Sequence, residues 1–182
     1  MEWLNSCSKM KLKKLNRSQK GFTLLELLIA IPIIAIVVAA ASGALVQVIQ
    51  STQTSAHMTA VRQVQTAGYW VSKDSLQAQN VITGASLTLN WKDWNDYNYQ
   101  VVYSLQDMSG GLKWLQRMEE VNGTGVATTM VGQFIDPDNT SWVWDDTNRV
   151  LTFTVTAKVT GARGPQTETR TYEIQVRPDP SP

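Results

Sequence analysis

Residues 20–28 read KGFTLLELL, and the apolar stretch that follows them, IAIPIIAIVVAAASGALVQVI, ends at residue 49. Between Glu26 and Gln47 lie 20 residues without a charge. About 20 apolar residues are enough for a helix to cross the hydrocarbon core of a membrane. An ordinary secretory signal has a shorter apolar segment, about 7–15 residues long, followed by a small-residue cleavage site. We therefore expect a membrane-spanning helix. Judged by hydropathy alone, the simplest interpretation is a plain single-pass membrane anchor.

The charges of the chain are distributed unevenly about the start of this run. Residues 1–21 hold six of the 16 basic residues and one of the 15 acidic residues, whereas the ten basic and 14 acidic residues of 22–182 leave a net charge of −4. Basic segments next to a membrane helix tend to stay in the cytoplasm. The sequence thus predicts a cytoplasmic N-terminal segment and a C-terminal part on the other side of the membrane.

Two residues of the opening stretch are unusual for a simple anchor. Glu26 lies within the apolar run, and a carboxylate in a membrane helix is costly and commonly functional. Gly21 has no side chain, so a protease could hold the bond between Gly21 and Phe22 closely. Cleavage there would remove the basic segment and create an amino group four residues before Glu26. The new ammonium group and the carboxylate could then pair, within one chain or between neighbours.

The string Lys-Gly-Phe-Thr-Leu-Leu-Glu-Leu-Leu before an apolar helix resembles the class III signal of type IV pilins and type II secretion pseudopilins. In that family a prepilin peptidase cuts after the glycine and N-methylates the next residue, and the acid at the fifth mature position guides assembly. The resemblance implies that Gly21 precedes the cut, that Phe22 is methylated and that Glu26 is the assembly carboxylate. Pro32 departs from the family pattern, and a proline kinks or breaks many helices.

The same resemblance implies the partners of the chain. They are the prepilin peptidase, other pilin or pseudopilin subunits, an inner-membrane assembly platform with its ATPase, and membrane lipid before assembly. The location that follows is the cytoplasmic membrane first and then a filament in the periplasm or at the cell surface. Neither a cofactor nor a nucleic-acid partner is expected.

The helix is expected to continue beyond the membrane. Residues 51–79 contain no proline and a single glycine, Gly68. Small and apolar residues recur at spacings of three and four, which is typical of an amphipathic helix. These residues are Val48, Thr52, Ala56, Ala60, Val61, Val64, Gly68 and Val71. Of the larger residues, Val61, Val64 and Val71, with Tyr69 or Trp70, would face a packed domain.

The C-terminal part has the period-two pattern of half-buried strands. Leu151 to Val159 and Thr171 to Arg177 alternate apolar and polar residues, and a turn-rich connector indicates a hairpin between them. Further strands are expected over 86–91, 97–105, 112–118 and 126–134, with residues 107–111 linking the middle pair. One-sided apolar faces favour an antiparallel sheet covered by the long helix. Six of the seven tryptophans lie beyond residue 69, where core and edge filling is the simplest role.

The predicted fold class is therefore α+β, with a long N-terminal helix packed on an antiparallel β domain, as in pilins. The predicted divisions are a leader over 1–21, a membrane or filament-core helix over 22–49 and its extramembrane continuation over 50–79. The β domain covers 80–178 and a tail covers 179–182.

Composition excludes several kinds of function. The chain has one Cys and one His, so it cannot build a Cys/His zinc site by itself. Cys7 lies in the segment expected to be removed, and His57 has no nucleophile paired with it by a local motif. The formal net charge of +1 is unlike that of a dedicated nucleic-acid binder. We predict that the protein is not an enzyme.

One segment of the C-terminal part is rich in acidic residues that could be metal ligands. Asp136, Asp138, Asp145 and Asp146 are weak candidates for a calcium site. The spacing does not fit an EF-hand, and Trp142-Val143-Trp144 intervenes, which favours a solvated loop.

A second resemblance concerns the role of the chain within the family. The strands of 99–118 around a Gly-Gly turn, and the C-terminal hairpin, resemble the larger minor pseudopilins of the J type. The predicted function is a minor structural subunit of a type IV pilus-like or type II secretion filament. The alternative is a membrane-anchored or filament-tip binding module that captures DNA, a sugar or a secreted protein.

Overall fold

The computed structural model of the protein describes residues 22–177. The leader over 1–21, with Gly21 and Cys7, and the tail over 179–182 lie outside the described residues. The chain divides into two compact units, residues 1–44 and residues 45–182. In the first unit the described residues form the apolar beginning of a helix, and the second unit contains the sheet.

Helix α1 runs from Leu24 to Ser75 and is 52 residues long. It continues through Pro32, whose ring nitrogen carries no hydrogen, so the carbonyl of Leu28 loses its usual helical donor. In its second half Ala60, Val64, Ala67 and Val71 are fully buried. These four residues follow the spacing of one helix face, and the burial of Val64 and Val71 agrees with the predicted packing face.

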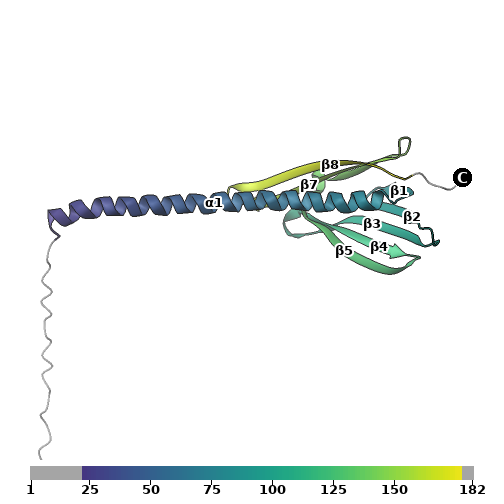
Figure 1. Ribbon diagram of the computed structural model, residues 1–182, viewed down its shortest axis with the longest axis horizontal. Coiled ribbons are helices and arrows are strands. Elements are labelled where there is room, and N and C mark those ends of the chain that lie inside the picture. The colour runs from purple at the N-terminus through teal and green to yellow at the C-terminus, as the bar shows by residue number, and fades with distance from the viewer. Residues whose placement is uncertain (1–21, 178–182) are drawn as a thin grey trace, which may run out of the picture. The chain divides into compact units, whose positions relative to one another are not determined.

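Eight strands follow the helix in chain order. They are β1 (Asn80–Thr83), β2 (Leu87–Lys92), β3 (Asn98–Asp107), β4 (Lys113–Val121), β5 (Thr124–Ile135), β6 (Ser141–Asp145), β7 (Val150–Gly161) and β8 (Gly164–Gln175), with short 3₁₀ turns η1 (Ser109–Gly111) and η2 (Pro137–Asn139). All strand pairs are antiparallel. Figure 1 shows the second half of α1 beside these strands.

The sheet has the order β1-β2-β3-β4-β5-β7-β6, and β8 pairs with the other edge of β7. Strands β3 and β4 form the expected hairpin across residues 107–113, and β7 and β8 form the expected C-terminal hairpin with Gly161 opposite Gly164. The link between β5 and β7 is a single pair, Ile135 with Ala157, because β6 takes the neighbouring part of the β7 edge.

The core lies between the helix and one face of the sheet. The largest fully buried side chains from the strands are Leu87, Leu89, Tyr103, Leu115, Ile135, Leu151 and Phe153. They pack with the buried helix face in one cluster. The expected α+β class, with a long helix on an antiparallel sheet, is confirmed.

The helix ends earlier than residue 79. Backbone hydrogen bonds from Gln77 and Ala78 to the carbonyl of Asp74, each 3.1 Å, close its last turn. Ala78 is fully buried, and the backbone N–H of Gln79 already donates to the carbonyl of Asn90 on β2. Pairing with β2 therefore draws the chain out of the helical path before Asn80.

One strand, β6, lies where the sequence pattern indicated a loop, and another, β1, lies outside the predicted strands. Strand β1 is short, and β6 comprises Ser141–Asp145, within the segment expected to be a solvated loop. Strand β6 pairs with β7, and Trp142 packs against the core beside Phe153. Exposed and partly buried residues alternate along β6, and its two tryptophans are the partly buried ones. The acidic residues on both sides of β6 make this pattern hard to recognise in the sequence.

Candidate processing and assembly site

The described part of the candidate site begins with Phe22 and Thr23, which precede α1. Glu26 lies in the first turn of the helix, and its side chain is exposed. Acidic side chains at this end of a helix are favourable because the N-terminal backbone N–H groups carry partial positive charge. Gly21, on the other side of the predicted cut, lies outside the described residues.

Thr23 and Glu26 form a reciprocal cap at the start of α1. Oε2 of Glu26 accepts hydrogen bonds from the backbone N–H of Thr23 at 2.9 Å and from its hydroxyl at 3.0 Å. The backbone N–H of Glu26 donates to Oγ1 of Thr23 at 3.2 Å. This is the capping box expected of Thr-x-x-Glu at a helix start. Sequence reasoning assigned Glu26 a role but did not recognise this cap, although the spacing of the two residues is its signal.

The cap places the carboxylate where it can accept further donors. An ionised carboxylate has about four lone-pair positions on two oxygens, and both Thr23 bonds go to Oε2. Because the side chain is exposed, a cation on a neighbouring molecule can approach it. Glu26 is thus oriented by its own helix end and accessible to a second chain.

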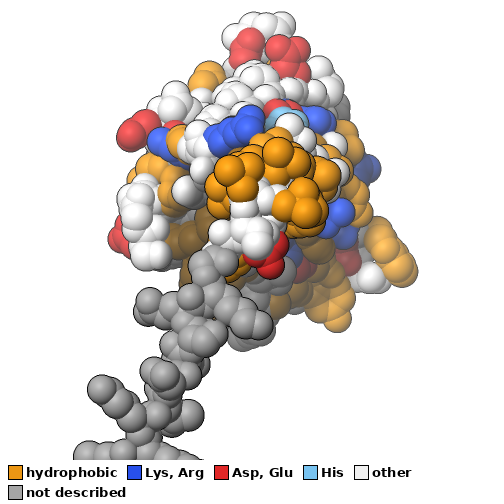
Figure 2. All heavy atoms as spheres, turned by 90° about the vertical axis from the view of Figure 1, so that its left-hand side faces the viewer, with side chains coloured by type: hydrophobic (Ala, Val, Ile, Leu, Met, Phe, Trp, Pro, Cys, Tyr) orange, Lys and Arg blue, Asp and Glu red, His pale blue; other side chains and the backbone are white. Residues whose placement is uncertain are grey.

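The helix that carries Glu26 is apolar and exposed along its first half. It is long and apolar enough to cross a membrane, and none of its most apolar 18-residue window is buried. Large exposed side chains in this segment include Leu25, Leu28, Ile33, Ile36 and Val38. Figure 2 looks from the N-terminal side of α1 and shows hydrophobic side chains over the nearest part of the helix. In water such a surface marks a site of membrane or protein contact.

The start of α1 and the residues before it have a counterpart in a known family model. Residues 16–42 match the family model described as the prokaryotic N-terminal methylation motif. This match agrees with the resemblance of residues 20–28 to the class III signal of type IV pilins and pseudopilins. The match covers the predicted cleavage point and the first part of α1. No curated protein and no solved structure matches the chain.

The weak metal candidates lie apart from the matched motif. Asp136 caps η2 by accepting from the backbone N–H of Asp138 at 3.2 Å, and Asp145 ends β6. The side-chain and backbone hydrogen bonds from Asn148 hold the pKa of Asp145 below its usual value. Within residues 22–177 no group of three or more His, Cys, Asp or Glu side chains could hold a metal ion. His57 is exposed on α1.

A buried ionic cluster joins the end of α1 to the sheet. The carboxylate of Asp74 accepts from Arg117 on β4 and from the hydroxyl of Tyr103 on β3. Arg117 also donates to Glu119 at 2.7 Å. Burial opposes the charge of Arg117, but its hydrogen bonds to Asp74 and Glu119 outweigh burial and raise the pKa of Arg117. The cluster fixes the helix end on the sheet, and nothing in the sequence pairs these distant residues.

Aromatic residues at the same end of the sheet also went unrecognised as a group. Trp91 and Tyr99 stack with ring centroids 5.4 Å apart and an angle of 3° between their planes. Trp94, in the turn between β2 and β3, is 91% exposed. Core and edge filling was expected for the tryptophans, and the almost fully exposed Trp94 is an exception. Alternation of aromatic and polar residues from Trp91 to Tyr99 is the signal that sequence analysis could have used.

Proposed function

We propose that the protein is a structural pilin or pseudopilin subunit, cleaved between Gly21 and Phe22 and N-methylated on Phe22. The peptidase adds water across the amide bond, which leaves a carboxyl group on Gly21 and an amino group on Phe22. The amino group then takes a methyl group from a methyl donor. The family match over residues 16–42 supports this processing.

The mature subunit then enters a filament through its apolar helix. Residues 22–49 are proposed to lie in the membrane before assembly and in the filament core afterwards, with 50–79 and the β domain of 80–178 outside the membrane. The basic leader would stay in the cytoplasm by the positive-inside tendency. Exposed apolar side chains of α1 support this, because contact with other subunit helices can replace their contact with lipid.

Glu26 is proposed to select the amino terminus of a neighbouring subunit. A carboxylate carried into an apolar filament core needs a cation, since an unpaired charge there is strongly unfavourable. The methylated amino group of a neighbouring Phe22 is such a cation. The observation that carries the proposal is the exposed Glu26, capped by Thr23, in the first turn of an apolar helix within the matched motif.

The assembly role is tested by incorporation of Glu26→Gln into filaments in cells that contain the cognate machinery. Glutamine keeps the size of the side chain and an acceptor oxygen but removes the charge. We expect normal cleavage and a fall in sheared-filament content on the order of tenfold. Glu173→Gln on the exposed side of β8 is the matched control and should assemble normally. Undiminished incorporation of Glu26→Gln would contradict the proposed role.

The subunit is proposed to be minor and J-type rather than the major fibre subunit. Support comes from the long β3–β4 hairpin, paired from Tyr99–Val121 to Asp107–Lys113, followed by further strands. The partners are then other pilin-type subunits, the peptidase and the assembly platform with its ATPase.

A second candidate role is capture of a ligand by the β domain at a filament tip. Its supporting observation is Trp94, whose side chain is almost fully exposed in a turn beside the Trp91–Tyr99 stack. Large aromatic residues that carry no core packing are common at binding sites. This role is compatible with assembly because the aromatic group lies on the sheet and Glu26 lies at the helix start.

A further inference from the structure

The turn between β2 and β3 is built to display Trp94. The carboxylate of Asp93 accepts hydrogen bonds from the backbone N–H groups of Asn95 and Tyr97, at 2.8 and 2.9 Å. The backbone N–H of Asp93 donates to the carbonyl of Tyr97 at 3.0 Å, and Lys92 pairs with Asp96 at 2.9 Å. A turn closed by these bonds fixes the backbone that carries the exposed indole, so less backbone entropy is lost when a ligand binds.

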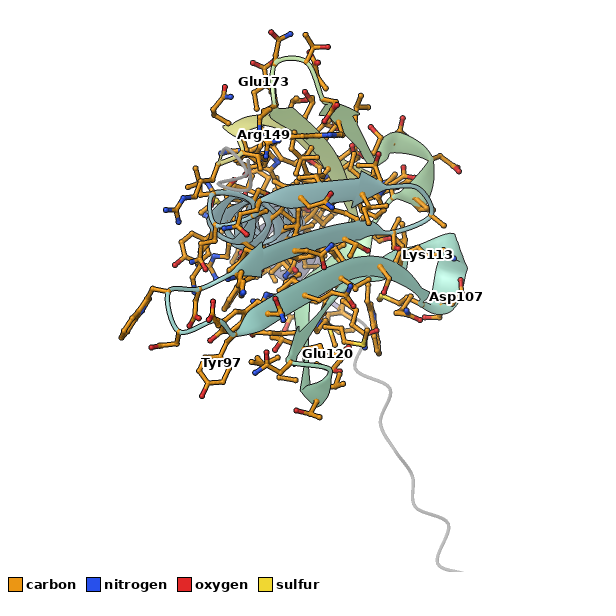
Figure 3. The ribbon with its side chains drawn as sticks, turned by 90° about the vertical axis from the view of Figure 1, so that its right-hand side faces the viewer. Tyr97, Asp107, Lys113, Glu120, Arg149 and Glu173 are labelled. Atoms are coloured by element: carbon orange, nitrogen blue, oxygen red, sulfur yellow. The ribbon has the colours of Figure 1, made fainter. Side chains whose placement is uncertain are left out.

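Two hollows adjoin at this end of the domain and share Gln77, Trp91 and Asp93. The first, about 480 Å³, lies among the last turns of α1 and strands β2–β5, and its walls include Trp70 and Tyr99. The second, about 490 Å³, is lined by Trp94 together with Gln79 and Arg177. Each volume is within the range of small-molecule sites, about 300–1,000 Å³. Figure 3 shows this end of the domain. The labelled Tyr97, next to the turn between β2 and β3, points away from the domain.

The chemistry of the walls limits the class of ligand. Among the described residues, neither hollow is lined by an aliphatic side chain. Peptide helices and lipid chains bind grooves that offer broad aliphatic surface, so these occupants fit poorly. The walls instead combine aromatic rings with amide, carboxylate, hydroxyl and basic groups, which supply both hydrogen-bond donors and acceptors.

The charge of the two hollows distinguishes between the remaining classes of ligand. The two hollows together hold four basic and three acidic side chains, so their charges nearly balance. Arg117 and Asp74, two of these charges, already pair with each other at 2.6 Å. Single-stranded nucleic acid stacks on aromatic side chains too, but it requires a positively charged groove along its backbone. Asp93 and Glu119 would repel phosphates here.

We propose that this aromatic groove, formed by Trp70, Trp91, Trp94 and Tyr99 with their polar neighbours, binds a neutral oligosaccharide. The faces of sugar rings present C–H groups that pack on aromatic rings, and their edges present hydroxyls that both donate and accept hydrogen bonds. Two adjoining aromatic-walled hollows suit a chain of several sugar rings better than a single ring. The inference gives a ligand class to the capture role and is independent of filament assembly.

The test uses the full chain, purified in a detergent without a sugar headgroup so that the detergent does not compete. Cellotetraose, chitotetraose and maltotetraose are the probes, and tryptophan fluorescence and titration calorimetry report binding. We expect saturable binding of at least one tetrasaccharide. A single-stranded thymidine 12-mer, tested in parallel, should not bind.

Trp94→Ala is the decisive variant, because its side chain is 91% exposed and its loss should leave the fold intact. It should weaken tetrasaccharide binding by about tenfold or more, as expected for a central aromatic contact. Trp114→Ala on β4 is the matched control, a partly exposed tryptophan outside both hollows, and should bind normally. Circular dichroism of both variants checks the fold.

Failure of all three tetrasaccharides, binding that Trp94→Ala leaves unchanged, or binding of the 12-mer at this site would each overturn the proposal. None of these results bears on the structural role, because cleavage and assembly are measured separately. Conversely, a Glu26→Gln chain that fails to assemble should still bind the sugar with wild-type affinity.

Discussion

Arg117 on β4 donates two hydrogen bonds to the carboxylate of Asp74, one residue before the end of α1, at 2.6 and 3.2 Å. Both side chains are almost fully buried, 8% and 3% exposed. The hydroxyl of Tyr103 donates to the same carboxylate at 2.5 Å. A charge buried in this way is tolerated only while its partners remain. The pair therefore holds the end of α1 against the sheet.

Asp74→Asn should destabilise the β domain strongly because it removes the buried carboxylate that pairs with Arg117 and leaves the partly exposed Glu119 to compensate this buried charge. We expect the free energy of unfolding to fall by about 3 kcal/mol, measured by denaturant titration of the full chain in detergent with tryptophan fluorescence. The matched control is Asp107→Asn, which breaks the pair with Lys113 at the β3–β4 turn (Figure 3). Asp107 is 91% exposed, so its loss should cost less than about 1 kcal/mol. Equal effects of the two substitutions would contradict this assignment.

The phenol of Tyr103 should make stability depend on alkaline pH. Burial, and next the negative charge of Asp74, raise the pKa of Tyr103 above its usual value of about 10. The folded state therefore favours the protonated phenol, and this contribution is complete below about pH 10 and lost as the pH rises further. The free energy of unfolding should decline above about pH 10, by at most about 1.4 kcal/mol per pH unit from this group.

Tyr103→Phe removes the titrating group and should flatten that decline, while it lowers stability at neutral pH by about 1–3 kcal/mol. The control Tyr69→Phe changes a tyrosine that is 62% exposed and should keep the wild-type pH profile. Identical alkaline profiles for the wild type and Tyr103→Phe would show that another group governs the effect.

Gly68 provides the close approach between α1 and β8. A Cβ atom at this position would overlap the ring of Tyr172, whose hydroxyl donates to the carbonyl of Val64 at 3.1 Å. Gly68→Ala should therefore lower the free energy of unfolding by about 1–3 kcal/mol through overpacking, despite the better helix propensity of alanine. Gly84→Ala, where no atom lies within 4 Å of the added Cβ, is the control and should be nearly neutral in thermal melting.

The cap at the helix start separates two roles of Glu26. Thr23→Val keeps the shape of the side chain but removes the hydroxyl that bonds with Glu26. If Glu26 acts in assembly by pairing with a neighbouring amino terminus, Thr23→Val should assemble close to wild-type levels while Glu26→Gln does not. Sheared-filament yield measures both variants. A loss of similar size in the two would assign Glu26 to capping alone.

The features of the fold that repeat locally could be predicted from the sequence. The apolar run and the three-and-four spacing around Val64 indicated a long helix, and the alternation of Leu151 to Val159 indicated a strand that became β7. The acidic context of β6 concealed a strand whose stability comes from pairing with β7. The helix ends just before Gln79, where the chain begins to pair with β2. This contact joins residues that are distant in the sequence, so no local pattern indicates it.

The candidate sites divide in the same way. Gly21, Phe22 and Glu26 lie within six positions of one another, so they form a motif that the sequence alone reveals. The match at residues 16–42 covers all three. The aromatic groove joins residues from the end of α1 and from several strands, which only the fold brings together. The sequence pattern therefore favoured core and edge filling for the tryptophans, whereas the position of Trp94 follows from the turn that Asp93 closes.

The most direct measurement of the central claim is intact and N-terminal mass analysis of the chain produced with and without a prepilin peptidase. The account predicts a chain that begins at Phe22 with one added methyl group when the peptidase is present. Without the enzyme, the leader should remain attached. An N-terminus at Met1 under both conditions, or a cut at any other bond, would contradict the account.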